Sequence, residues 1–420
     1  MAYVISKNNK ALMPCTNVIA RLLLKQKKAK VIKKTPFTIK LNYETTNYTQ
    51  DLILGVDTGS GTLGTAVSNE NNEIVYLSEV ILRNDITDKM KRRASYRRNR
   101  RYRKTRYRKA RWLNRKNSTK NDRFSPTMQS KFHTHIKEIE YIKTILPITD
   151  IVLETGQFDT HLMKNPSLSN ENIKHWGYQK GQNYGFDNTK AMVLNRDNYT
   201  CQHCKGKHKD SKLEVHHIIF RCNNGSDEAD NLITLCHTCH KALHDKKIKL
   251  DVKGKTKGTL KYATQMNSIR VKLLKTYFEA IETFGFITKL NRLMLGIDKE
   301  HYYDACVIST GGKNFSVKCV LLKKKCISKG DFQQTKGVRS EQKIPTGKIS
   351  GFKKFDKVLY LKKEYFIKGR MSSGYALLMN IEGQRITFND APKGFKTPKT
   401  SNLKRLEARK SWIVSSTKII

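Results

Sequence analysis

The sequence predicts a mixed α/β protein in which a compact metal-binding module interrupts a larger domain of strands and helices. Three observations predict it. Short apolar runs that end in an acid recur far apart in the chain, Cys and His gather between positions 195 and 245, and Gly-punctuated β-type segments follow position 311. With 420 residues, of which 38% are hydrophobic, the chain has enough apolar side chains for about two or three domains.

The net charge indicates a polyanionic partner. The chain has 82 Lys and Arg against 36 Asp and Glu, a formal charge of +46, and such an excess repels itself unless a polyanion neutralises it. Nucleic acid is the natural candidate. An anionic membrane is the other, but no apolar run approaches the ~18 residues that span a bilayer. The segment Met1 to Lys10 lacks the apolar core of a secretory signal, so we expect a cytoplasmic protein without a membrane partner.

The most specific signal is a pair of Cys-x-x-Cys turns. Each turn presents two thiolates, and four sulfurs close a tetrahedron around one Zn²⁺. Such a closed site leaves no position free for chemistry, so we expect this zinc to be structural. The nine cysteines are an odd number, and in a reducing compartment the pairs favour metal over disulfides. The expected zinc ligands are Cys201, Cys204, Cys236 and Cys239.

Between the two turns, adjacent histidines predict a hydrolytic centre. His216 and His217 point to opposite sides of a strand, so one binds a metal while the other takes a proton from water. Asn231 offers an oxygen ligand suited to Mg²⁺. The alternative is that His216, His217 and His240 are further zinc ligands or core histidines. The pattern resembles the HNH nuclease ββα-metal motif. The resemblance implies that His217 is the general base, that His216 and Asn231 bind one Mg²⁺, and that His240 is a further ligand or a phosphate contact.

Three acids adjoin short apolar segments that we expect to be strands. Asp57 ends the run from Leu52, Glu154 ends the run from Ile151, and Asp304 lies near a third. Acids at strand ends can meet in space, and such a cluster persists only with cations among them, such as two Mg²⁺ about 4 Å apart. The alternative for each acid alone is a turn or a helix cap. A further helix is expected at about Thr264 to Phe284.

The order of these motifs resembles the split RuvC/RNase H family. Gly55-Val56-Asp57-Thr58-Gly59-x₄-Gly64 resembles its first strand, where glycines let a phosphate approach the backbone, Ile151 to Glu154 its second motif, and His301-Tyr302-Tyr303-Asp304-Ala305 its third. The resemblance implies that Asp57, Glu154 and Asp304 hold two Mg²⁺ and that His301 is a base or orients water.

Residues 89–116 contain 16 Lys or Arg and no acid. Basic residues recur at steps of three or four, so they form one face of a helix of about 22 residues that phosphates stabilise. The alternative is a disordered polybasic tail. The expected nucleic-acid-binding residues are Arg93, Arg97, Arg100, Lys104, Arg108, Arg111 and Arg115.

Taken together, these features resemble the IscB family of transposon-encoded nucleases. Its N-terminal domain is named for a Pro-Leu-Met-Pro string, and the chain has Ala11-Leu12-Met13-Pro14, with Ala11 as the departure. The resemblance implies a fold of a split RNase H-like (RuvC) domain with an inserted ββα-metal HNH domain, an arginine-rich bridge helix, a small α+β N-terminal domain and a β-rich C-terminal domain. The expected divisions are 1–50 (N-terminal), 51–88, 119–185 and 248–310 (RuvC parts), 89–118 (bridge helix), 186–247 (HNH) and 311–420 (basic C-terminal domain).

The family also implies a function and partners. We expect an RNA-guided double-strand DNA endonuclease whose HNH centre cuts the guide-paired strand and whose RuvC centre cuts the displaced strand. The C-terminal domain would bind guide RNA and duplex DNA beside the target. The protein would act as a monomer in a ribonucleoprotein, at the nucleoid when bound to DNA. One alternative is a protein-guided HNH endonuclease of homing or restriction type. A second alternative is a non-catalytic RNA-binding protein with a structural zinc site.

Overall fold

A computed structural model describes most of the chain and divides it into two compact units. Unit 1 comprises Met1–Gly156 and Ser268–Ile420, and unit 2 comprises Gln157–Asn267. The chain therefore leaves unit 1, forms unit 2 and returns. The described residues are 1–102, 124–164, 169, 178, 183–208, 210–223, 225–252, 260–328, 332–333, 342–343, 349–371, 373–389 and 396–417.

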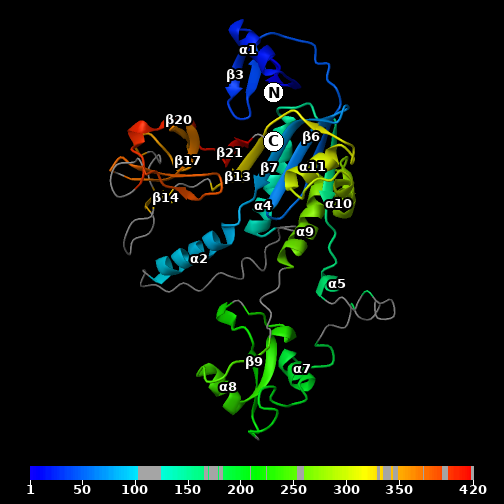
Figure 1. Cartoon of the computed structure of the whole chain (residues 1–420), viewed down its shortest axis with the longest axis vertical. Helices are drawn as coiled ribbons and strands as arrows, with labels where there is room; N and C mark the ends of the chain where they lie inside the picture. Colours follow the sequence, from blue (N-terminus) through cyan, green and yellow to red (C-terminus); the bar gives the residue numbers. More distant parts are fainter. Residues whose placement is uncertain are drawn as a thin grey trace. The chain divides into compact units, whose positions relative to one another are not determined.

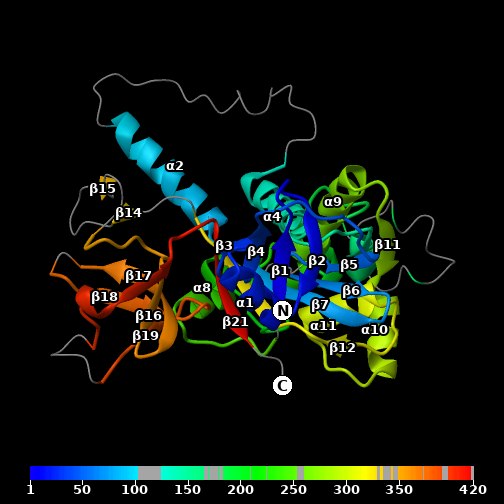
Figure 2. The same ribbon diagram turned by 90° about the horizontal axis from the view of Figure 1, so that it is seen from above.

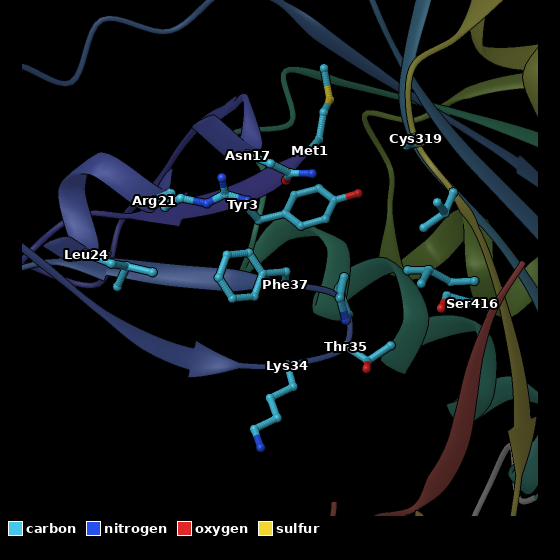
Figure 3. A pocket seen from close by; sticks show the side chains of 13 residues that line it. Met1, Tyr3, Asn17, Arg21, Leu24, Lys34, Thr35, Phe37, Cys319 and Ser416 are labelled. Carbon is cyan, nitrogen blue, oxygen red and sulfur yellow. The ribbon is translucent and has the colours of Figure 1, made fainter. Parts of the chain in front are cut away.

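The N-terminal module of unit 1 is a small sheet with one helix. Its strands lie in the order β2-β1-β4-β3, and Val4, Leu12 and Ile39 are buried in its core. The hydroxyl of Tyr3 donates to the carbonyl of Val75 at 3.0 Å. A cavity of about 510 Å³ lies beside this contact, and Figure 3 shows Tyr3 and Phe37 on one side of it and Cys319 and Ser416 on the other. The elements are β1 (Ala2–Ile5), β2 (Ala11–Cys15), α1 (Asn17–Lys25), β3 (Ala29–Lys33) and β4 (Thr38–Leu41).

A large mixed sheet forms the centre of unit 1. Its strand order is β11-β8-β5-β6-β7-β13-β21, with β12 paired to β7. The strands β5, β6 and β7 run antiparallel in succession, whereas β8 and β11 are parallel to β5. The strands are β5 (Leu52–Asp57), β6 (Thr62–Asn69), β7 (Glu73–Ile81), β8 (Asp150–Thr155), β11 (Ile281–Phe284), β12 (Ser316–Val317), β13 (Leu321–Cys326) and β21 (Trp412–Thr417).

Helices cover both faces of this sheet (Figure 2). Alternate residues of β5 face opposite sides: Leu52, Leu54 and Val56 pack on one side with the helix α4, and the other side packs against α11. Figure 1 shows α11 lying against the strands β6 and β7. The helices are α2 (Ile86–Tyr102), α4 (Pro126–Lys143), α9 (Lys261–Thr276), α10 (Gly285–Met294) and α11 (His301–Ser309).

Two glycines set how closely α11 approaches the sheet. A Cβ at Gly55 would lie 2.5 Å from the Ala305 carbonyl oxygen, and one at Gly64 would lie 2.0 Å from that of His301. Both contacts are shorter than real Cβ atoms show, so these positions require glycine. We expected these glycines to let a phosphate approach the backbone, but the backbone of α11 occupies that space instead. This close approach brings His301 next to the end of β5.

A buried ion pair ties the sheet to α4. The Lys324 ammonium lies 2.6 Å from Glu138 Oε1, and both side chains are almost fully buried. The hydroxyls of Tyr76 and Ser78 donate to the same carboxylate oxygen at 2.8 Å. Hydrogen bonds of this kind compensate the cost of burying the charges, and they fix the position of α4 under the sheet.

The prediction of a helix from about Thr264 to Phe284 is wrong for the second part of this segment. The helix α9 ends at Thr276, and Ile281–Phe284 forms the strand β11 at the edge of the sheet. Ile281 pairs with Val152 and Phe284 with Thr155. The β-branched and aromatic residues of this segment suit a pleated edge, and pairing with β8 outweighs continuation of the helix.

Unit 2 contains a two-stranded sheet with a following helix. The strands β9 and β10 are antiparallel, with His216 opposite Ile233 and His217 opposite Leu232. The chain then enters α8 directly from β10. The elements of this unit are α5 (Thr160–Lys164), α7 (Thr189–Arg196), β9 (Leu213–His217), η2 (Arg221–Asn223), η3 (Ala229–Asn231), β10 (Leu232–Cys236) and α8 (His237–His244).

The C-terminal part of unit 1 is β-rich. A five-stranded antiparallel sheet in the order β19-β18-β17-β16-β20 has its own core around Val358, Ile367 and Leu378. Within the described residues, no helix is both long and apolar enough to cross a membrane. The elements are β14 (Phe332–Gln333), β15 (Gln342–Lys343), β16 (Lys357–Tyr360), β17 (Lys363–Arg370), β18 (Ala376–Met379), β19 (Arg385–Ile386), η5 (Thr400–Asn402) and β20 (Lys404–Glu407).

Candidate metal centres

Two of the predicted acids meet at the ends of neighbouring parallel strands in unit 1. Asp57 ends β5 and is directly opposite Glu154 on β8, and only 7% of Asp57 is exposed. The hydroxyl of Thr58 donates to the Glu154 carbonyl at 2.6 Å, which holds the turn after Asp57 against β8. The two carboxylates therefore lie next to each other at the C-terminal ends of β5 and β8.

The helix α11 adds a histidine and a third acid to this carboxylate cluster. His301 Nδ1 lies 2.6 Å from Asp57 Oδ2, and this hydrogen bond raises the pKa of His301. Burial and the charge of Asp57 raise the pKa of Asp304. Arg292 Nε lies 3.0 Å from Asp304 Oδ1 as an ion pair, but without hydrogen-bond geometry. The expectation that Asp304 adjoins a strand is wrong, because it lies in the first turn of a helix.

Glu154 has the features of a cation ligand. Burial and the charge of Asp57 raise its pKa to about 7, against a hydrogen bond from Thr288. Its Oε2 is buried without a hydrogen-bond partner among the described residues. A cation at that oxygen would satisfy it and restore the charged form. In the described part of the chain, the three acids do not all lie within 4.8 Å of one another.

The four cysteines of unit 2 converge as predicted. Their sulfurs all lie within 4.8 Å of one another, and Cys204 Sγ is 3.8 Å from Cys236 Sγ. A tetrahedron with Zn–S bonds of about 2.3 Å has edges of about 3.8 Å. Although burial opposes it, hydrogen bonds from the His208 backbone and from neighbouring thiols lower the pKa of Cys204, whereas burial raises the pKa values of Cys236 and Cys239. The cluster fits a structural zinc.

Removing one of these thiols should destabilise unit 2. Cys204→Ser is expected to lose about one zinc per chain and to lower the unfolding temperature of unit 2 by about 10 °C or more, because zinc binding contributes folding free energy. Elemental analysis and thermal unfolding measure both. Cys222→Ser is the matched control, since Cys222 is an exposed free cysteine of the same unit. Equal zinc content and stability in both variants would show that the cluster holds no structural metal.

Three histidines form a second group in unit 2. One ring nitrogen from each of His216, His240 and His244 lies within 4.8 Å of the others. His216 Nε2 is buried without a hydrogen-bond partner among the described residues. Burial and the neighbouring histidines lower the pKa of His216 to about 4, so its ring is neutral and able to bind a metal at pH 7. Three protein ligands leave a further coordination position open, and imidazole ligands suit transition metals better than Mg²⁺.

His244 was not among the predicted site residues. His240 and His244 are four residues apart on α8 and therefore share one face of the helix. That spacing is visible in the sequence and was the signal that could have identified His244. The structure adds the position of the helix, which directs this face at His216 of β9.

His217 points away from this histidine group, as the alternation of the strand requires. Its Nε2 lies 2.9 Å from Asp227 Oδ1, and Arg221 Nε is 2.7 Å from the same oxygen. The hydrogen bonds from His217 and Arg221 lower the pKa of Asp227. The carboxylate thus orients the imidazole, and Nδ1 has no hydrogen-bond partner among the described residues, so it is available for proton transfer.

Asn231 stabilises the loop between β9 and β10 through hydrogen bonds to its backbone. Its side-chain oxygen accepts a hydrogen bond from the Ile219 backbone N–H at 2.9 Å, and its nitrogen donates to the carbonyls of Ile219 and Ser226. Asn231 is fully buried. These bonds shape the loop that carries Asp227, while the predicted role of Asn231 as a metal ligand stays a prediction.

Glu214 contacts His240 of the histidine group. Its Oε2 lies 2.6 Å from His240 Nδ1, so the other ring nitrogen of His240 is the one available to a metal. Carboxylates that hydrogen-bond a ligand histidine fix its orientation and raise its basicity. Lys212 lies 3.0 Å from the other oxygen of Glu214 and holds the carboxylate in place.

Glu214→Gln should therefore weaken metal binding without removing a ligand. We expect the affinity of the histidine group for Co²⁺ to fall about 10- to 100-fold. The d–d absorption of Co²⁺, titrated into full-length protein whose cysteine cluster already holds zinc, measures it. Asp251→Asn, an exposed acid of the same unit, is the control. An unchanged Co²⁺ affinity in Glu214→Gln would contradict this role.

The arginine-rich segment is described only in its first part. Arg93 and Arg97 lie on α2 and are exposed, and Arg100 lies on the same helix. The remaining predicted contacts, Lys104, Arg108, Arg111 and Arg115, lie outside the described residues. The role of all seven in binding nucleic acid stays a prediction.

Comparison with known proteins identifies the family. The model of the RRXRR protein family matches residues 2–181, and the model of the HNH endonuclease family matches residues 201–246. Together they span more than half of the chain. The chain is an IscB-like nuclease. Residues 201–246 form an HNH endonuclease domain, and both candidate metal groups of unit 2 lie within it.

Curated relatives match this IscB-like nuclease over short segments. Anaredoxin of Nostoc sp. is 33% identical over 69 residues, which are 16% of this chain and 88% of the relative. The type IV methyl-directed restriction enzyme EcoKMcrA of Escherichia coli is 37% identical over 62 residues, which are 13% of this chain and 22% of that enzyme.

A solved structure was also matched. Cas9 of Streptococcus thermophilus, in complex with the AGAA PAM, is 12% identical with a TM-score of 0.33, and the match covers 58% of this chain and 32% of that chain. The IscB-like nuclease therefore spans about a third of the length of that protein and about a fifth of that of the restriction enzyme.

Proposed function

We propose that this IscB-like nuclease is an RNA-guided endonuclease that cuts both strands of a DNA duplex at two separate centres. The observation that carries the proposal is the presence of two unlike candidate metal centres, one in each unit. Unit 1 has the carboxylate cluster of Asp57, Glu154 and Asp304 with His301, and unit 2 has the histidine group, with His217 next to His216 on β9. A chain that makes a single cut needs only one of them.

In unit 1, the strand order supports a split RuvC domain. The strands β7-β6-β5-β8-β11, with only β6 antiparallel to the other four, have the arrangement of RNase H-like folds. Asp57, Glu154 and Asp304 would hold two Mg²⁺, which supply charge stabilisation at the attacking and leaving oxygens. His301, held by Asp57, is placed to orient or deprotonate a water molecule, and Arg292 limits how far Asp304 can turn.

In unit 2, His217 would act as the general base. Asp227 accepts the hydrogen bond from Nε2 and stabilises the imidazolium that forms when Nδ1 takes a proton from water. His216, His240 and His244 would hold one divalent ion, which stabilises charge on the scissile phosphate when bound. Mg²⁺ was the predicted ion, and three nitrogen ligands favour Mn²⁺, Co²⁺ or Ni²⁺ over it.

The guide and the strand assignment rest on the family resemblance and on charge. A net charge of +46 suits a protein that neutralises many phosphates and leaves sequence recognition to base pairing. We assign the guide-paired strand to the HNH centre and the displaced strand to the carboxylate cluster. The basic segment from residue 89 would contact the guide RNA, and the β-rich C-terminal domain would contact guide RNA and the duplex beside the target. The protein would act as one copy in the ribonucleoprotein.

Purification and sequencing of bound RNA test this proposal. The protein, expressed with its native flanking DNA, should retain one discrete structured RNA that is lost at high salt, because phosphate contacts dominate its affinity. Cutting should occur only at DNA that pairs with this RNA. Sequence-specific cutting by RNA-free protein would instead establish the protein-guided HNH endonuclease, and retained function in His217→Ala would favour a non-catalytic RNA-binding protein.

A further inference from the structure

Two phenylalanine rings lie side by side at the start of α10. The centroids of Phe284 and Phe286 are 6.2 Å apart, and the ring planes differ by 8°. Phe286 is 71% exposed, and Phe284 is half-buried. Exposing a large aromatic side chain costs free energy in water, and the same helix also exposes Leu290 and Leu293. This aromatic pair is an apolar surface without a partner in the described part of the chain.

The residue between the two rings contacts the carboxylate cluster. A Cβ at Gly285 would lie 3.0 Å from Glu154 Oε1. On its inner side, α10 carries Thr288 and Arg292, which are buried and interact with Glu154 and Asp304. The helix therefore has one face in the cluster and the opposite face exposed. The two rings thus flank Gly285, the residue of this segment that borders Glu154.

Charge favours a nucleic acid as the occupant of this surface. The helix α10 contains Lys289 and Arg292 and no acidic residue, and Lys289 is exposed. Aromatic rings bind bases by stacking, and this requires a base whose face is open. Inside a duplex, neighbouring base pairs already cover both faces of each base. The rings thus select an unpaired strand.

We propose that Phe284 and Phe286 form a stacking platform for unpaired bases of the strand that enters the carboxylate cluster. The platform holds the nucleotides next to the scissile phosphate and excludes duplex DNA from the cluster. This inference rests on the proposed function, because it takes a phosphodiester as the substrate of the cluster. A platform that selects unpaired bases would explain why the carboxylate cluster cuts the displaced strand, which is unpaired.

Site-specific photocrosslinking tests the platform. A benzoyl-phenylalanine is placed at position 286 of the full-length protein, or at position 278 as the control. Phe278 is 81% exposed and precedes the first residue of β11, at the opposite end of that strand from Phe284. With a labelled single-stranded 30-mer, we expect the crosslink yield at 286 to exceed that at 278 by about fivefold, and to fall to the control yield with the duplex. Equal yields, or a crosslink at 286 to a second copy of the protein, would refute the platform.

Cleavage kinetics separate this inference from the proposed function. Phe284→Ala/Phe286→Ala should lower kcat/KM for a single-stranded oligonucleotide about tenfold, because the bases next to the scissile phosphate lose their stacking on the aromatic rings. Phe278→Ala should match the wild type, and Phe286→Trp should retain activity. If Asp57→Ala cuts the oligonucleotide as fast as the wild type, the proposed cluster is wrong. If Asp57 is required but the double variant cuts normally, only the platform is wrong.

Discussion

Asp57→Ala should lower cutting of the displaced strand about a thousandfold, since a cation at the scissile phosphate contributes several kcal/mol of charge stabilisation. Asp57 faces Glu154 across the parallel pair and holds His301, so its loss removes a ligand and frees the histidine. Cutting of the guide-paired strand should be unchanged, because His217 and the histidine group belong to another unit.

A duplex with a different label on each strand measures this effect. The wild type should give two labelled products, and Asp57→Ala only the product of the guide-paired strand. Asp150→Asn is a matched control, because Asp150 is an exposed acid at the other end of β8 from Glu154. Loss of both products in Asp57→Ala, with the fold and zinc content intact, would argue against two independent centres.

His217→Ala should give the complementary nickase. Without the base, cutting of the guide-paired strand should fall about 10²- to 10⁴-fold, while the displaced strand is cut at the wild-type rate. Asp227→Asn should lower the same rate by a smaller factor, because the imidazole keeps a partner but loses the charge that stabilises its protonated form.

The same labelled duplex serves for this variant. His208→Ala is the control, since His208 is exposed in the same unit. Normal cutting of the guide-paired strand by His217→Ala would reassign the base. Equal loss on both strands would mean that unit 2 must act before unit 1 can cut.

Much of the carboxylate cluster was predictable because strands impose simple rules. An apolar run that ends in an acid predicts where a buried strand stops, and the structure has β5 ending at Asp57 and Glu154 near the end of β8. The position of Asp304 on a helix was not predictable in this way. Its approach depends on Gly55 and Gly64, whose missing side chains admit the backbone of α11. A glycine alone does not reveal whether a ligand or a helix lies against it.

In unit 2, spacing predicted the zinc ligands but not His244 or the partners of the histidines. The two Cys-x-x-Cys turns meet as their geometry requires, and adjacent histidines on a strand face opposite sides. No sequence pattern distinguishes Asp227 or Glu214 from the other acids. The folded loop brings Asp227 to His217, and the strand β9 brings Glu214 to His240. The sequence also did not reveal that Asn231, predicted as a metal ligand, makes hydrogen bonds to the backbone of the loop.

Anomalous diffraction from crystals grown with Mn²⁺ tests most directly whether this chain carries separate metal centres. The account predicts zinc at Cys201, Cys204, Cys236 and Cys239, one manganese at His216, His240 and His244, and two manganese ions about 4 Å apart among Asp57, Glu154 and Asp304. Manganese at the histidines but none at the three acids, in crystals that contain bound DNA, would contradict it and leave a nuclease with a single centre.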